Sequence, residues 1–260
     1  MTTNAARPQL EARGLSLTFG GFTVLSDIQA NFPSGEITGL IGPNGAGKTS
    51  LFNCLTGLYR PQRGTIRFAG APFDGLPPTL RARRGLSRSF QHVALCPDLT
   101  AIENVMFGLA RQGRSGWTAA LLGLLSARVE QAGTRARARR ALERLGIARF
   151  ADTLPAGLPP GTLRLVEIAR AIVGEPKILL LDEPAAGLNA AETKELTRVL
   201  RQLVAPDLVM VVVEHDMDLI MEICDSIYVL NFGKLIAHGS PDAVRRNPEV
   251  ARIYLGAEDD

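Results

Sequence analysis

Apolar and polar positions alternate over residues 9–32, and Gly20-Gly21 interrupts the alternation. This pattern predicts two antiparallel strands joined by a turn. Three later runs are mostly apolar and have the length of a strand, at 36–41, 177–182 and 208–213. Such runs are typical of parallel strands that are buried on both faces. The chain is therefore predicted to combine an antiparallel β region with a parallel α/β core.

Helical spacing dominates the middle of the chain, over 100–111, 126–147 and 162–173. About 130 residues separate the loop after the first apolar strand from the acidic end of the second, far more than one crossover helix needs. We therefore expect a single domain over 1–260, with an α/β core (1–90 and 175–260) interrupted by a helical insertion (91–174). Further strands are predicted at 64–69, 86–90, 226–230 and 234–238, and further helices at 50–56, 190–204, 216–223 and 241–246.

Residues 42–49 fit the pattern G-x-x-x-x-G-K-[ST] between a predicted strand and a predicted helix. Glycine lets backbone N–H groups face a phosphate, and the helix presents its positive N-terminal end to the same anion. Lys48 is expected to reach the β- and γ-phosphates of a nucleotide, and the Thr49 hydroxyl to bind Mg²⁺. A Gly-rich turn without a ligand is the alternative, but the full pattern rarely arises by chance. The nucleotide-binding residues predicted here are Gly42, Asn44, Gly45, Gly47, Lys48, Thr49 and Ser50.

Two carboxylates, Asp182 and Glu183, end the second apolar strand, at the sheet edge where α/β folds bind ligands. Asp182 is expected to hold Mg²⁺, and Glu183 to polarise the attacking water. An exposed acidic turn is the alternative. His215 follows the third apolar strand in the same way and is a candidate for contact with the γ-phosphate, although a lone histidine is more often structural.

Two further residues are weaker candidates. Gln91 lies where the core meets the insertion, so it could touch Mg²⁺ or water, although a loop glutamine is usually just solvated. Phe19 ends an early strand and could stack on adenine. Phe22 competes for that role, and a core phenylalanine is the plain alternative.

Composition narrows the function. The chain has 260 residues, and its net charge of +3 is too small to indicate nucleic acid. Three scattered cysteines fit neither a disulfide framework nor a zinc site. The N-terminal residues lack the apolar core of a secretory signal, and the sequence has no run of 18 apolar residues, so we expect no targeting signal and any membrane role to be peripheral. The arginine clusters at 81–84 and 135–140 could bind DNA or anionic lipid, but a solvated helix face is the favoured interpretation.

The order of these motifs resembles the ATP-binding cassette (ABC) family over nearly the whole chain. The matching pieces are Phe19, residues 42–49 (Walker A), Gln91 (Q-loop), 158–162 (signature), 178–183 (Walker B), 187–189 (D-loop) and His215 (switch). Ser89-Phe90-Gln91, the stretch 183–189 and 214–217 resemble one subgroup, the larger ATPase subunit of branched-chain amino acid importers, with urea and amide importers as close relatives.

The resemblance implies a P-loop NTPase fold with a RecA-like core, and an ATPase that uses ATP and Mg²⁺. It also implies two permease subunits, a substrate-binding protein and a second ABC ATPase, identical or different, as partners. The chain would sit at the cytoplasmic side of the plasma membrane and bind no nucleic acid. In this family Leu158, Gly161 and Thr162 would lie against nucleotide on the partner ATPase.

One departure concerns that signature, which reads Leu158-Pro159-Pro160-Gly161-Thr162 where the family usually has L-S-G-G-Q. Pro159 has no hydroxyl and Pro160 has no N–H, so we expect the cross-subunit contact to be weaker or differently made. Gly161 remains, and the helix over 162–172 could still aim its positive end at phosphate.

The competing hypothesis from the sequence is a soluble mechanical ABC ATPase that is not tied to transport. Proteins of that kind usually carry two cassettes or a long coiled coil, whereas this chain has one phosphate-loop motif and no sustained heptads. A GTPase would need an N-K-x-D motif, which the sequence lacks. A small-molecule kinase would lack the 158–162 and His215 elements.

Overall fold

The protein is described by a computed structural model that covers residues 9–89, 95–109 and 125–255. Its chain forms two compact units. The first comprises 1–88, 177–184 and 200–260, and the second comprises 89–176 and 185–199. The segment 185–199, which the sequence analysis assigned to the α/β core, groups here with the helical unit.

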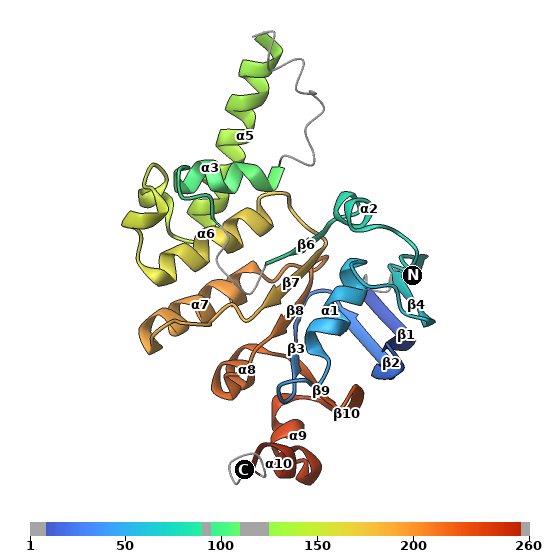
Figure 1. The fold of residues 1–260 in the computed structure, drawn as a ribbon. Helices are drawn as coiled ribbons and strands as arrows, with labels where there is room; N and C mark the ends of the chain where they lie inside the picture. Colours follow the sequence, from blue (N-terminus) through green and yellow to red (C-terminus); the bar gives the residue numbers. More distant parts are fainter. Residues whose placement is uncertain (1–8, 90–94, 110–124, 256–260) are drawn as a thin grey trace, which may run out of the picture. The chain divides into compact units, whose positions relative to one another are not determined.

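Two sheets build the first unit (Figure 1). The antiparallel sheet has the order β2-β1-β4-β5, and the second sheet has the order β10-β9-β3-β8-β7-β6. In the second sheet, β6, β7, β8, β3 and β9 run parallel, and β10 pairs with β9 in the antiparallel sense. The strands of this unit are β1 (Gln9–Phe19), β2 (Phe22–Pro33), β3 (Ile37–Ile41), β4 (Arg63–Phe68), β5 (Ala71–Pro72), β6 (Leu86–Arg88), β7 (Ile178–Asp182), β8 (Val209–Val213), β9 (Ser226–Asn231) and β10 (Lys234–Gly239).

One apolar cluster joins the two sheets of the first unit. Helix α1 (Lys48–Thr56) contributes Leu51, Phe52 and Leu55, which cluster with buried side chains from both sheets. Strands β3, β7 and β8 are buried at every position, which explains their continuous apolar sequences. The remaining helices of this unit are α2 (Pro78–Arg83), α8 (Met217–Ile223), α9 (Pro241–Arg245) and α10 (Pro248–Leu255).

The second unit is helical. Helix α3 (Ala101–Met106) packs against α5 (Leu125–Arg144) and α6 (Pro160–Ile172). A capping box formed by Thr100 and Glu103 begins α3. The Asn104 side chain accepts the Cys96 N–H at 2.7 Å and donates to the Leu99 carbonyl at 2.8 Å, so it fixes the preceding loop. Short 3₁₀ turns lie at Phe107–Leu109, Ala148–Phe150 and Pro155–Gly157, and α7 (Ala190–Leu203) begins in this unit.

The predicted hairpin, the three apolar strands and the main helices are confirmed within a few residues. The short elements β5 and α2 and the C-terminal α10 were not predicted. The solvated-face interpretation is wrong for Arg81, which is 3% exposed. Its guanidinium donates to the carbonyls of Cys54 at 2.7 Å, Leu55 at 2.6 Å and Leu76 at 3.0 Å. The last carbonyl groups of a helix lack partners from its own turns, and Arg81 donates to two carbonyls at the end of α1, of which that of Cys54 also accepts the Gly57 N–H at 3.1 Å.

Candidate functional site

The loop over residues 42–47 joins β3 to α1 and is shaped by its glycines. Gly42 has φ +152°, and a Cβ there would lie 2.1 Å from the Leu230 carbonyl oxygen. Gly47 has φ +107° and caps the start of α1. Only glycine fits these positions without strain. Asn44, Gly45 and Thr49 are exposed along the loop and the first turn of α1, where a ligand can reach them.

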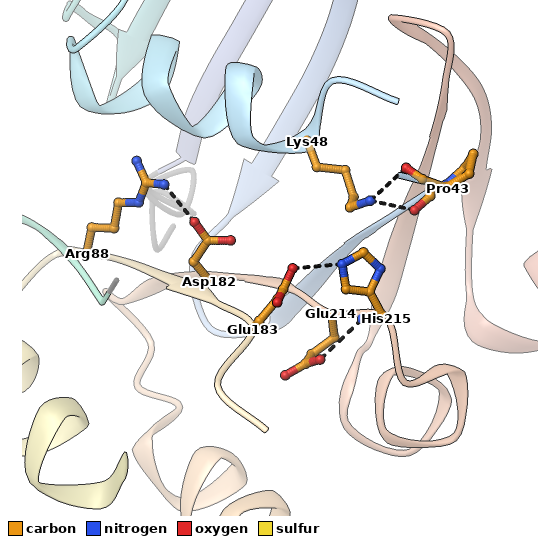
Figure 2. A network of polar contacts seen from close by, with 8 residues as sticks. Pro43, Lys48, Arg88, Asp182, Glu183, Glu214 and His215 are labelled. Carbon is orange, nitrogen blue, oxygen red and sulfur yellow. Dashed lines mark hydrogen bonds and ion pairs between the residues drawn. The ribbon is translucent and has the colours of Figure 1, made fainter. Parts of the chain in front are cut away.

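The Lys48 ammonium is folded back onto this loop (Figure 2). It donates to the Gly42 carbonyl at 2.5 Å and to the Pro43 carbonyl at 2.9 Å. Burial lowers the pKa of Lys48, and the charges of Glu183 and Asp182 act in the opposite direction. Lys48 is therefore a buried cation that interacts electrostatically with both carboxylates at the end of β7.

Parallel pairing brings the ends of three strands together. Asp182 at the end of β7 pairs with Val213 at the end of β8, which also pairs β3 at Leu40. Glu183 has φ +48°, a strained conformation for this residue, and its N–H donates to the Val213 carbonyl at 2.9 Å. This backbone turn aims the Glu183 side chain at His215, whose Nε2 lies 2.7 Å from Glu183 Oε1 (Figure 2).

Arg88 belongs to this group, although the sequence analysis did not single it out. It ends β6, and its guanidinium lies 2.6 Å from Asp182 Oδ2 and 2.6 Å from Asn53 Oδ1. The guanidinium also stacks over the Phe52 ring at 5.6 Å. Its partner was not visible in the sequence, because 94 positions separate it from Asp182 and only the β6–β7 pairing makes them neighbours.

The phenylalanine candidates from the sequence are not part of this group of charged residues. Phe19 ends β1, is 47% exposed and meets the Tyr59 ring edge-on at 5.1 Å, whereas Phe22 is 80% exposed. A neighbouring ring therefore orients Phe19, and the choice between the two phenylalanines as the adenine contact stays a prediction. Gln91 lies outside the described residues.

The signature segment lies in the second unit and is described there by itself. Helix α6 begins at Pro160. Proline is tolerated at the first position of a helix, because the N–H of that residue would have no partner within the helix. Leu158, just before the helix, is buried. The Gly161 N–H donates to Glu192 Oε1 at 2.9 Å. The other oxygen of Glu192 accepts the Asn189 N–H at 3.1 Å, and Asn189 Oδ1 in return accepts the N–H of Glu192. A carboxylate of the same chain therefore occupies the Gly161 amide. Thr162, in the first turn of α6, is partly exposed.

These features define an α/β P-loop nucleotide-binding protein with a helical unit. Residues 25–186 match the protein family described as "ABC transporter", and residues 234–260 match that described as "Branched-chain amino acid ATP-binding cassette transporter". The chain belongs to the ABC transporter family, as an ATP-binding ATPase.

Similar proteins support this assignment. The high-affinity branched-chain amino acid transport ATP-binding protein LivG of Escherichia coli K12 is 44% identical over 252 residues, which are 96% of this chain and 99% of LivG. The ADP conformation of MJ1267, an ATP-binding cassette of an ABC transporter, has a TM-score of 0.83 at 26% identity, over 96% of this chain and 100% of that one. A dimeric post-hydrolysis structure of the cassette MJ0796 with ADP and Pi has a TM-score of 0.73 at 25% identity, over 89% and 98%.

Across the part of the chain that the structure describes, no helix has both the length and the apolar character needed to cross a membrane.

Proposed function

We propose that this chain hydrolyses Mg-ATP to drive an importer of branched-chain amino acids or a related small polar solute. The observation that carries the proposed cargo is the 44% identity to LivG, which extends over almost the full length of both chains. The match of residues 234–260 to a branched-chain amino acid transporter family supports the same cargo. The alternative, a soluble mechanical ATPase, has no comparable support.

The phosphates of ATP would lie along the loop over 42–47 and the first turn of α1. Backbone N–H groups of this loop and the Lys48 ammonium would bind them, together with Asn44, Thr49 and Ser50. Lys48 now donates to two loop carbonyls, so phosphate oxygens would replace acceptors that it already uses. Phe19 would stack on the adenine.

Mg²⁺ would suit the donors in the first turn of α1 and at the end of β7. Oxygen ligands from a hydroxyl and a carboxylate are those that Mg²⁺ prefers, and Thr49 and Asp182 supply them, with Gln91 as a further candidate. Once bound, the metal ion would neutralise charge that develops on the phosphates. Gly42 and Gly47 shape the loop that precedes α1, and Thr49 lies in the first turn of that helix.

The Glu183 carboxylate would accept a proton from the attacking water or orient that water. The 2.7 Å contact with His215 orients the Glu183 carboxylate, and the strained backbone conformation of Glu183 determines the direction in which its side chain leaves the strand. His215 is half-exposed, so its ring could also contact the γ-phosphate.

The conformational change that drives transport would require pairing with a second ABC ATPase. The cassette MJ0796 is dimeric in its post-hydrolysis structure. Leu158, Gly161 and Thr162 would then face nucleotide on the partner. Permease subunits would receive the motion, a substrate-binding protein would deliver the cargo, and the chain would be peripheral on the cytoplasmic face of the membrane, without nucleic acid.

Glu183→Gln tests the hydrolytic assignment. This variant should keep its affinity for a fluorescent ATP analogue but lose at least about a hundredfold in turnover, because a general base contributes 10²–10⁴-fold. Glu222→Gln, an exposed position on α8, is the matched control and should hydrolyse ATP normally. Normal turnover of Glu183→Gln would refute its assigned role.

The cargo is tested in the natural host by deleting the chain and measuring uptake of labelled leucine and labelled urea. Loss of leucine uptake, restored by the wild-type chain but not by Lys48→Ala, is the expected result. Loss of urea uptake alone would move the cargo to the related importers, and membrane fractionation that leaves the chain entirely in the soluble fraction would favour the mechanical ATPase.

A further inference from the structure

Arg88 is an unassigned cation at the proposed metal-binding carboxylate (Figure 2). Its side chain is 9% exposed and that of Asp182 is 6% exposed, so their 2.6 Å ion pair is largely shielded from water. Charges interact more strongly in such surroundings than at a surface. Arg88 therefore has a larger electrostatic effect on Asp182 than an exposed arginine could have.

Arg88 is also fixed in place. Asn53 Oδ1 accepts from its second terminal nitrogen at 2.6 Å, and the Phe52 ring lies under the guanidinium. Both residues belong to α1, the helix that starts at Lys48. The charge is thus held from two sides, by α1 and by β7, and a metal ion arriving at Asp182 would meet it there.

We propose that Arg88 is a positioning residue that makes metal binding at Asp182 depend on nucleotide. This inference rests on the proposed role of Asp182. In the absence of nucleotide, a divalent cation must share one carboxylate with a fixed guanidinium, and the two like charges repel each other. Nucleotide phosphates bring several negative charges and additional oxygen ligands, so they would screen the guanidinium charge from the metal ion and add an attraction that exceeds the remaining repulsion. The metal ion then enters with the nucleotide rather than before it.

The test is a Mn²⁺ titration of the full chain, with free Mn²⁺ followed by electron paramagnetic resonance, with and without saturating ADP. Arg88→Gln removes the charge but retains an amide that can donate to Asp182. We expect it to bind Mn²⁺ about tenfold more tightly without nucleotide, and to differ from wild type by less than about threefold with ADP. Structural damage would weaken binding in both conditions.

Two controls separate charge from geometry and from total charge. Arg88→Lys keeps the charge and should bind Mn²⁺ as the wild type does, which can be measured even where Arg88→Gln folds poorly. Arg63→Met removes an exposed arginine from β4 and should also match the wild type. Arg88→Lys binding tightly, or Arg88→Gln binding no tighter than the wild type without nucleotide, would overturn the inference.

Asp182→Asn distinguishes this inference from the proposed function beneath it. If Asp182→Asn leaves Mn²⁺ binding unchanged with ADP present, the metal assignment itself fails. If Asp182→Asn weakens binding with ADP but Arg88→Gln brings no gain without it, only the role of Arg88 fails. The gain expected in Arg88→Gln should vanish when the two substitutions are combined, because both act on the same carboxylate.

Discussion

Replacing Arg81 by methionine should destabilise the first unit substantially. The guanidinium donates to three carbonyl oxygens, at 2.6, 2.7 and 3.0 Å, and lies 5.3 Å from the Phe73 ring centre. Methionine has a similar length and fills the same space without any donor. Three backbone carbonyls would lose this partner, two of them at the end of α1.

The size of the loss follows from opposing effects. Hydrogen bonds to charged groups contribute about 1.5–3 kcal/mol each, so three of them set an upper bound of roughly 4.5–9 kcal/mol. Burial opposes the charged state, which is why the pKa of Arg81 is lowered, and the substitution relieves that cost. We expect a net loss of about 2–4 kcal/mol, or a fall in Tm of roughly 4–16 °C for a protein of this size.

Urea and thermal unfolding followed by circular dichroism measure this loss. Arg84→Met is the matched control, because the Arg84 side chain is exposed and, among the described residues, donates to the Pro72 carbonyl at 3.1 Å. Its free energy of unfolding should change by less than about 0.5 kcal/mol. Equal effects of the two substitutions would refute the role of Arg81 as a buried cap of α1.

Two further predictions concern other parts of the chain. Glu192→Ala should lower the free energy of unfolding by about 1–2 kcal/mol, because the Gly161 and Asn189 N–H groups lose their acceptor. Glu195→Ala, on the exposed face of α7, is the control and should cost less than about 0.5 kcal/mol; equal losses in urea titrations would contradict the bridging role of Glu192. Burial raises the pKa of Cys54 to about 11 and that of Cys224 to about 12. At pH 8 a thiol reagent should therefore label the exposed Cys96 rapidly, and the other two cysteines only after unfolding. Rapid labelling of all three thiols in the native protein would disprove this burial.

Local sequence predicted most of the first unit. The alternation over β1 and β2, the apolar runs of β3, β7 and β8, and the loop before α1 each leave a pattern within a short stretch of consecutive residues. Short elements such as β5 and α2 escaped prediction because two to six residues carry too little periodicity to be distinguished from loops.

The sequence by itself determined the phosphate loop, the acidic end of β7 and the histidine after β8, because each motif lies within a few consecutive residues. Only the tertiary structure decided which charges these residues meet. Arg88 reaches Asp182, Arg81 reaches the end of α1, and Glu192 reaches the Gly161 amide across separations of 94, 27 and 31 positions. From sequence alone, an arginine is predicted to lie on the solvated surface. It can be buried only when folding brings distant hydrogen-bond acceptors to it and excludes water from its surroundings.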